Sequence, residues 1–241
     1  MSLTILSGGA AQGLVAAVAP QFKAETGADI DGTFGAVGAM RDKLLAGAPA
    51  DMLILTASLI AELTQAGRIV AGSAADLGAV ATGVAVRVGD PAPAIGDADA
   101  LRAALRAADG IYFPDPKLAT AGIHFAKVLE RLGIADEVAG RLRVFPNGAA
   151  AMQALAEVKN GRPIGCTQAT EILNTPGVTL VGPLPRQFEL ATVYTAGVGA
   201  RAALPEQARR LAALLSGEAA RTVRERVGLE ALASPSPHHP S

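Results

Sequence analysis

Short apolar runs alternate with stretches of helical periodicity along most of the chain. Apolar residues at 3–6 predict a strand, and residues 12–25 carry Leu14, Val15, Val18 and Phe22 at helical spacing. The same alternation continues with predicted strands at 28–34 and 52–55 and helices at 39–46 and 56–66. Repeated strand–helix units are typical of parallel strands, so the pattern predicts an α/β fold.

A long apolar, β-branched run at 80–88 predicts a buried strand that leads into a second series of units. The remaining strands are predicted at 111–113, 142–145, 163–167, 178–181 and 190–198, and the remaining helices at 99–107, 121–132, 148–159, 205–215 and 218–227. Two units joined by two long strands predict two lobes. We expect lobe 1 to contain residues 1–81 and 192–232, lobe 2 residues 82–191, and residues 233–241 to be a disordered tail.

Composition excludes several classes of function. Among 241 residues, 21 are basic and 22 acidic, so the chain lacks the charge excess expected of a protein that binds nucleic acid or an anionic membrane. The single cysteine, Cys166, excludes an internal disulfide and a cysteine-based zinc cluster. No P-loop, nucleophile elbow, zinc spacing or dinucleotide fingerprint is present, so neither a cofactor nor a metal ion is predicted.

The N-terminus shows no signal peptide, because Met1 to Leu3 runs directly into the first predicted strand without a basic region. No apolar stretch has the length of a membrane span, so the protein is not expected to be embedded in a membrane. As written, the chain is expected to be a cytoplasmic monomer. It is expected in the periplasm if a leader has been removed.

Four predicted loops share one form, in which a strand end is followed by small residues and a helix start. They cover residues 7–13, 35–40, 119–123 and 147–149. Helix N-termini carry unpaired N–H groups and partial positive charge, and small residues allow an oxyanion to approach the backbone. Because ligands of open α/β sheets bind at the carboxyl ends of strands, the loops together predict an anion site. For any one loop, a simple tight turn remains the alternative.

Two motifs and one helix carry a family resemblance. The motif GAPAD at 47–51, the motif FPDPKLATAG at 113–122 and the helix at 125–133 resemble the molybdate-binding branch of the periplasmic solute-binding proteins. The similarity extends to about Leu229. It implies a two-lobed type II periplasmic-binding-protein fold that binds a small oxyanion or organic carboxylate in the cleft. It also implies an ABC permease as a partner if the protein is exported.

The resemblance implies a ligand site in which this chain departs from the family. Family members hold the oxyanion with serine hydroxyls of the first two loops, backbone N–H groups of the next two, and a tyrosine. The matching positions here are Ala10 or Ala11, Ala36 and Val37, Ala121, Gly148, and Gln168. All three side-chain donors are replaced, which predicts a larger or differently shaped ligand.

Other polar residues near the loops are candidates for binding such a ligand. Neutral donors are available at Ser7, Thr120, Asn147, Thr167, Gln168 and Thr170. Arg41 is suited to a bidentate contact with a carboxylate, and its alternative role, like that of Lys117, is a solvated cation. Tyr194 is either a cleft residue or a packed hinge aromatic. Asp51 and Asp115 are expected to cap turns or helices.

The alternative function is catalytic. Aconitate isomerase is similar to the molybdate-binding proteins, and it moves a proton across the allylic system of an unsaturated tricarboxylic acid. Such chemistry needs carboxylate anchors and one group that shuttles a proton. Arg41 and the helix starts are the candidate anchors here, and His124 or Glu171 the candidate shuttle. A cytoplasmic sensing or partner-binding module is the third hypothesis.

Overall fold

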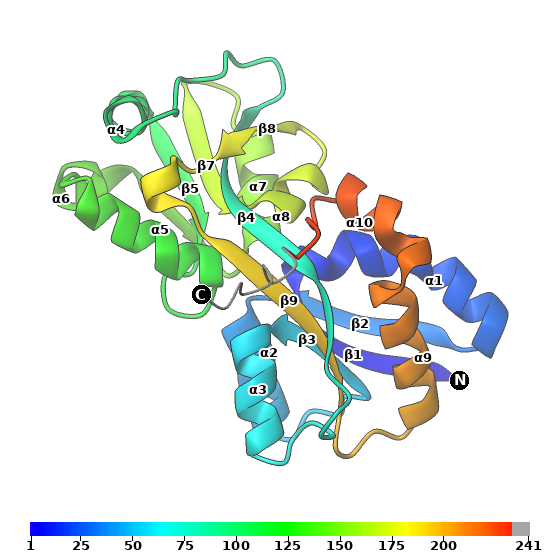
Figure 1. Cartoon of the computed structure of the whole chain (residues 1–241). Helices are drawn as coiled ribbons and strands as arrows, with labels where there is room; N and C mark the ends of the chain where they lie inside the picture. Colours follow the sequence, from blue (N-terminus) through cyan, green and yellow to red (C-terminus); the bar gives the residue numbers. More distant parts are fainter. Residues whose placement is uncertain (233–241) are drawn as a thin grey trace, which may run out of the picture.

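The computed structural model describes residues 1–232, and the tail predicted at 233–241 lies outside these residues. The chain folds into two α/β lobes that share one extended sheet (Figure 1). The strands are β1 (Ser2–Gly8), β2 (Asp29–Gly35), β3 (Met52–Thr56), β4 (Ala75–Arg87), β5 (Gly110–Pro114), β6 (Leu142–Phe145), β7 (Pro163–Gln168), β8 (Val178–Pro183) and β9 (Ala191–Val198).

The helices flank the sheet and alternate with its strands. They are α1 (Gln12–Thr26), α2 (Val37–Leu45), α3 (Ala57–Gln65), α4 (Ala98–Ala107), α5 (Thr120–Arg131), α6 (Ala135–Val138), α7 (Gly148–Glu157), α8 (Ala169–Leu173), α9 (Pro205–Ser216) and α10 (Arg221–Arg226). Single 3₁₀ turns are η1 (Gly9–Ala11), η2 (Ala139–Arg141), η3 (Arg186–Phe188) and η4 (Glu218–Ala220).

Strands β4 and β9 connect the lobes. The strand order is β2-β1-β3-β9-β4-β7-β5-β6, with β8 also beside β4. The first half of β4 pairs with β9, ending at Ala81 opposite Ala191, and the next residue, Thr82, lies opposite Gln168 of β7. We propose that the lobes divide at this change of partner, where the sequence pattern places the boundary.

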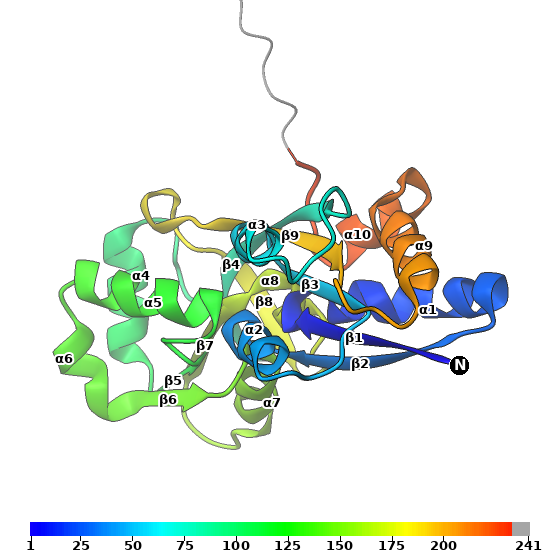
Figure 2. The ribbon, with the colours of Figure 1, turned by 90° about the horizontal axis from the view of Figure 1, so that it is seen from below.

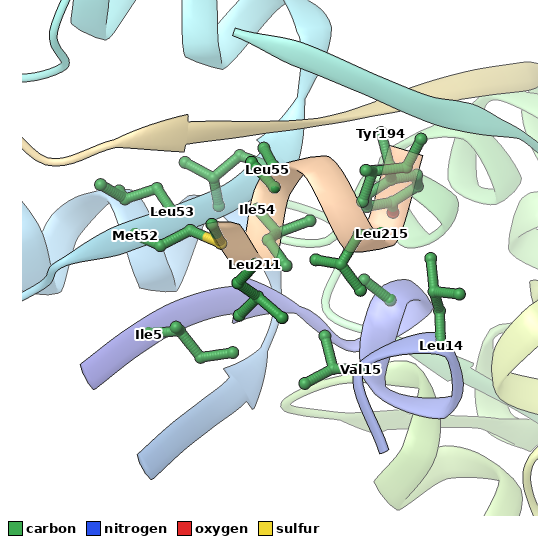
Figure 3. Close-up of a cluster of buried hydrophobic side chains, with 14 of the residues drawn as sticks. Ile5, Leu14, Val15, Met52, Leu53, Ile54, Leu55, Tyr194, Leu211 and Leu215 are labelled. Atoms are coloured by element: carbon green, nitrogen blue, oxygen red, sulfur yellow. The ribbon is translucent and has the colours of Figure 1, made fainter. Parts of the chain in front are cut away.

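Each lobe has its own apolar core. In lobe 1, β1, β3 and β9 pack on α1 and α9, and Figure 3 shows Ile5, Leu14 and Leu215, from three of these elements, as members of one cluster. In lobe 2, the cluster that contains Phe113 and Phe125 forms on one side of the sheet, and a smaller cluster around Met152 lies under α7 and α8. Small aliphatic residues dominate because aromatic residues make up only 3% of the chain.

Most predicted elements are confirmed to within a few residues, with three differences. The short helices α6 and α8 were not predicted. The helix predicted at 218–227 is a 3₁₀ turn followed by α10. The strand predicted at 80–88 begins earlier, at Ala75, because its first half pairs with the returning strand β9.

The two acidic residues of the family motifs are structural caps, as predicted. The buried Asp51 carboxylate accepts the N–H groups of Thr4 and Leu204, each at 2.9 Å, and so ties β1 to the start of α9. Asp115 Oδ1 accepts the N–H groups of Lys117 and Leu118. Both carboxylates therefore accept backbone hydrogen bonds that stabilise the fold. Within residues 1–232, no helix combines the length and the apolar character needed to cross a membrane.

Candidate ligand site between the lobes

The starts of α2 in lobe 1 and α5 in lobe 2 meet across the gap between the lobes. The Gly38 N–H donates to the carbonyl oxygen of Leu118 over 3.0 Å. A methyl group added to Gly38 would lie 2.9 Å from the same oxygen, so only glycine allows this approach. Both views of the fold place the two helix starts side by side (Figures 1 and 2).

A cleft of about 530 Å³ lies at this meeting point. We call it the cleft, and its lining residues are Val37, Gly38, Arg41, Thr56, Ala57, Ser58, Leu59, Lys117, Leu118, Thr120, Ile123, Leu190, Ala191, Thr192 and Val193. The N-cap residues of α2 and α5 are Ala36 and Ala119, neither of which can cap with its side chain. Apart from the Gly38 N–H, which the Leu118 carbonyl oxygen accepts, the N–H groups of both first turns therefore have no side-chain cap, which favours an anion beside them.

Two cations stand at the cleft. Arg41 is 36% exposed in its side chain and pairs with Asp42 over 2.8 Å, while Lys117 is exposed. The neighbouring Thr192 is buried, and its hydroxyl lacks a hydrogen-bond partner in the described part of the chain. The cleft thus combines positive charge with unused polar groups.

Beside the cleft, a second group brings together four buried polar residues and two glycines. We call it the junction, and it consists of Gly9, Gly148, Thr167, Gln168, Glu171 and Tyr194. Its centre is the Glu171 carboxylate, whose Oε2 accepts the Thr167 hydroxyl over 2.6 Å. Burial raises the pKa of Glu171 to about 6, although hydrogen bonds from Thr167 and from the backbone N–H groups of Gln168 and Gly148 act in the opposite direction.

Two glycines make room for this carboxylate. A methyl group added to Gly148 would lie 1.9 Å from Glu171 Oε2, and one added to Gly9 would lie 2.5 Å from Oε1. Gly9 belongs to η1 of lobe 1, whereas Gly148 begins α7 of lobe 2. Glu171 therefore lies against segments of both lobes.

Gln168 and Tyr194 complete the junction. The Gln168 amide donates to the Tyr194 hydroxyl at 3.4 Å, and Gln168 Oε1 is buried without a hydrogen-bond partner among residues 1–232. Burial, and after it the charge of Glu171, raises the pKa of Tyr194, which keeps its hydroxyl neutral. Tyr194 also lies against Gly8, as does Val37 of the cleft.

A comparison with protein families shows to which family the chain belongs. Residues 3–230 match the model of the bacterial extracellular solute-binding proteins. The chain belongs to this family. The predicted resemblance and the predicted type II fold are thereby confirmed.

Three individual proteins are similar to this chain over most of its length. The chain is 28% identical over 238 residues to an aconitate isomerase of Pseudomonas sp, covering 95% of this chain and 87% of that protein. The periplasmic molybdate-binding protein of Azotobacter vinelandii superposes with a TM-score of 0.80 at 18% identity, covering 96% of this chain and all of that one. The sulfate-binding protein SubI of Mycobacterium tuberculosis gives 0.74 at 19%, covering 95% and 86%.

The structure divides the predicted site residues of this solute-binding protein between the two regions. Val37, Arg41 and Thr120 line the cleft, with Ala36 and Ala121 directly beside it in the chain. Gly148, Gln168, Glu171 and Tyr194 meet at the junction. The Ser7 hydroxyl donates to the Gly8 carbonyl oxygen in the interior below Gly9.

Other predicted residues have structural partners. His124 Nε2 lies 2.6 Å from the Phe188 carbonyl oxygen, and the residue does not line the cleft. Asn147 Oδ1 caps α7 by accepting the Ala150 N–H. Ala10 and Ala11 are packed in the core of lobe 1. Among the described residues, no three potential ligands are grouped closely enough to hold a metal ion.

Sequence reasoning missed three contributors. Leu118 and Thr192 line the cleft, and Gly9 contacts the Glu171 carboxylate. Gly9 had a signal, because it follows a predicted strand within the first candidate loop. Leu118 lay within the FPDPKLATAG motif but was not named as a site residue, because its role depends on the contact between the lobes. Thr192 had no signal, since its role depends on pairing between β4 and β9.

Proposed function

We propose that this solute-binding protein holds a small organic carboxylate in the cleft between its lobes. The observation that carries the proposal is the meeting of two helix starts without side-chain caps, those of α2 and α5, beside Arg41 and Lys117. The two helix starts supply N–H donors and partial positive charge, and the two side chains supply cationic groups suited to carboxylates.

The size of the cleft favours an organic ligand over a single inorganic oxyanion. Its volume of about 530 Å³ falls within the range of about 300–1,000 Å³ that small-molecule sites occupy. Neutral groups such as the Thr120 and Thr192 hydroxyls line the same space and suit the uncharged parts of such a molecule. The curated relative named above, an aconitate isomerase, supports the same class of ligand.

A thermal-shift screen tests this proposal. We expect the melting temperature to rise with di- or tricarboxylates and to remain unchanged with molybdate, tungstate, sulfate and phosphate. Arg41→Ala and Lys117→Ala should each reduce the shift. The matched controls are Arg209→Ala, which removes an exposed arginine of a surface ion pair, and Lys127→Ala, which removes an exposed lysine of α5. A shift by inorganic oxyanions alone would overturn the proposal.

Isomerisation of an unsaturated tricarboxylic acid is the second candidate, and Glu171 is the observation that favours it. A carboxyl group with a pKa of about 6 both accepts and returns a proton near neutral pH. In this function Glu171 would take a proton from one end of the allylic system and deliver a proton to the other end, while the cleft cations hold the carboxylates. Because Glu171 does not line the cleft, the substrate would have to extend from the cleft into the junction. The Thr167 hydroxyl would position the Glu171 carboxyl group.

Incubation of cis- and trans-aconitate with the protein in D₂O, followed by proton NMR, tests this candidate. We expect conversion between the isomers with deuterium at the exchanged carbon. Glu171→Gln should lower the rate by about 10²- to 10⁴-fold, the usual effect of removing a general acid–base group. Glu157→Gln, an exposed substitution at the far end of α7, should leave the rate unchanged, as should His124→Ala. Absence of conversion would leave binding as the function.

Transport and localisation follow from the same proposal. If the ligand is bound without conversion, we propose that the protein works outside the cytoplasm and delivers its ligand to an ABC permease. Detection of the native protein in a periplasmic fraction, and ligand uptake that depends on it, would support this role. Native protein confined to the cytoplasm would contradict it.

A further inference from the structure

The Glu171 carboxylate is covered by both lobes but receives hydrogen bonds from only one of them. Its donors are the Thr167 hydroxyl and the N–H groups of Gln168 and Gly148, and all three residues belong to lobe 2, as Glu171 does. Lobe 1 contributes Gly9, where an added methyl group would lie 2.5 Å from Glu171 Oε1. Within residues 1–232, no group of lobe 1 donates a hydrogen bond to this carboxylate. Lobe 1 therefore excludes water from Glu171 without supplying a donor in its place.

The helix that carries Glu171 is packed between the lobes. On its lobe 1 side, α8 lies against η1 and α1. A methyl group added to Gly13 of α1 would lie 3.3 Å from the Oδ1 atom of Asn174, and one added to Gly228 would lie 2.9 Å from the Cδ1 atom of Leu173. If the lobes separate, these contacts break and water returns to the carboxylate, while the donors of lobe 2 stay beside it.

No charged group compensates the charge of Glu171. Of the elements packed against α8, β7, β8 and η1 contain no aspartate, glutamate, lysine, arginine or histidine. Charged residues of the other neighbouring segments are bonded elsewhere or exposed, namely Lys23 with Asp29, Glu25 with Arg210, Asp76 with Thr195, Arg87 with Asp90, and exposed Glu157 and Glu230. Two further titratable groups, Tyr194 of β9 and Cys166 of β7, stay neutral because burial raises the pKa of each.

We propose that protonation of Glu171 controls the closure of the two lobes, because closure buries the carboxyl group without giving it a new hydrogen-bond donor. The neutral carboxyl group loses little when lobe 1 covers it. The carboxylate loses its water and gains no partner, so its burial is costly. The inference goes beyond the proposed function, since it concerns the equilibrium between open and closed lobes and holds whichever ligand is bound.

The direction of the pH effect follows from the two forms. In the closed form burial raises the pKa of Glu171 to about 6, from an ordinary value of 4.5. In the open form water and the donors of lobe 2 surround the carboxylate, so its pKa is lower. As the pH rises from about 4.5 to 6, closure comes to require release of water from a charged group. We expect the ratio of closed to open protein to fall by at least about tenfold across this window and to stay constant above it.

Energy transfer between dyes on the two lobes measures closure directly. Ala61→Cys on α3 and Ala103→Cys on α4 replace exposed alanines of lobe 1 and lobe 2, and the native Cys166 is buried and so protected from labelling. The unliganded double-cysteine protein is compared with the same protein carrying Glu171→Gln, from pH 4.5 to pH 8. We expect similar transfer in the two at pH 4.5. At pH 7.5 transfer should be lower with Glu171, whereas the glutamine, which does not titrate, should keep the lobes closed.

Two further variants assign the effect to the buried carboxylate. Glu157→Gln removes a charge at the exposed end of α7 and should leave the pH profile unchanged. Thr167→Val removes a donor that water replaces only in the open form. It should therefore raise the closed-form pKa of Glu171 further and shift the upper end of the window to higher pH.

The outcomes decide the inference without reference to the ligand. Titrations of other groups are common to the compared proteins, so identical pH profiles with Glu171 and with Glu171→Gln would overturn it. Wider separation of the lobes at pH 4.5 than at pH 7.5 would overturn it as well. If Glu171→Gln does not melt cooperatively, Thr167→Val decides, and an unmoved window then counts against the inference. Binding of organic acids is measured separately, so its failure would contradict the proposed function alone.

Discussion

The cleft and the junction are adjacent, because Val37 of the cleft and Tyr194 of the junction both lie against Gly8. Their polar groups are nevertheless satisfied in opposite ways. In the cleft, the first turns of α2 and α5 have no side-chain cap, and Arg41 and Lys117 stay accessible to solvent. In the junction, Thr167 and two backbone N–H groups converge on the buried carboxylate of Glu171. The helix starts of the cleft carry no side-chain cap of the protein, whereas the donors of the junction bind the protein's own Glu171.

The difference shows that helix N-termini alone do not reveal where a ligand binds. The start of α7 has small residues and a glycine, like the starts of α2 and α5. The Glu171 carboxylate lies against the start of α7, where an anion would otherwise bind. The Asn147 side chain caps the first turn of the same helix. The absence or presence of a side-chain acceptor at the helix start, rather than the form of the loop, separates the cleft from the junction.

The largest expected effect is that of filling the junction. Gly148→Ala would place a methyl group 1.9 Å from Glu171 Oε2 and 2.2 Å from Thr167 Oγ1. We expect the free energy of unfolding, measured by urea denaturation, to fall by about 2 to 3 kcal/mol, as is usual for overpacking in a buried site. Gly140→Ala, whose added carbon meets nothing within 4 Å, is the control. An unchanged stability for Gly148→Ala would mean that the junction is not tightly closed.

The next effect is the pH dependence of stability that Glu171 causes. Below its ordinary pKa of 4.5 the carboxyl group is protonated in both folded and unfolded chains. Between 4.5 and about 6 only the folded chain keeps the proton, so the free energy of unfolding falls as the pH rises through this window. We expect Glu171 to contribute a loss of about 2 kcal/mol across it.

Comparison of wild type with Glu171→Gln isolates this contribution. The difference between their unfolding free energies, measured from pH 4 to pH 8, should change by that amount, since the glutamine does not titrate. A difference that is independent of pH would show that Glu171 keeps an ordinary pKa.

A smaller effect is expected in the cleft. Arg41→Ala should weaken binding of the organic acid by about tenfold, the usual size of a lost hydrogen bond to a charged group. Its effect on the melting temperature of the unliganded protein should be negligible, because the side chain is partly exposed and its one ion pair within residues 1–232 is with Asp42. A large loss of stability without loss of affinity would place Arg41 among structural residues.

The smallest effect concerns the contact between the lobes. Gly38→Ala adds a carbon 2.9 Å from the Leu118 carbonyl oxygen and should favour separation of α2 from α5. We expect affinity to fall by about two- to fivefold, because a smaller fraction of the protein is closed. Small-angle scattering should report a larger radius of gyration, whereas Gly96→Ala, which meets nothing within 4 Å, should leave it unchanged. Equal radii and affinities would show that this contact does not control closure.

The fold was predictable because local patterns of apolar residues mark most of its strands and helices. The apolar runs at 52–55 and 142–145 coincide closely with β3 and β6, and the periodicity of 12–25 with α1. The GAPAD and DPKLATAG motifs indicated the family because each holds an acidic residue that fixes the fold: Asp115 caps a local turn, and Asp51 joins β1 to the start of α9. Such contacts lie at fixed places in the chain and leave a recognisable trace.

The site was predictable only in part. Candidate loops were located, but the position of Glu171 depends on α8, a helix of five residues that has no clear periodicity and was not predicted. Its contact with Gly9 joins residues 162 positions apart, which no local pattern encodes. His124 was a candidate by residue type, and its bond to the Phe188 carbonyl oxygen depends on packing between distant segments.

The shared strands β4 and β9 also determine which lobe can fold first during synthesis. The core of lobe 1 requires β9 and α9, which lie in the last quarter of the chain, next to β3 and α1 from its beginning. Lobe 2, between β4 and β9, is continuous in sequence. As the ribosome releases the chain from its N-terminus, lobe 2 can therefore be complete while β1, β2 and β3 still wait for their partner strand. The apolar edge of β3 is exposed during this interval, and protection by chaperones would matter most there.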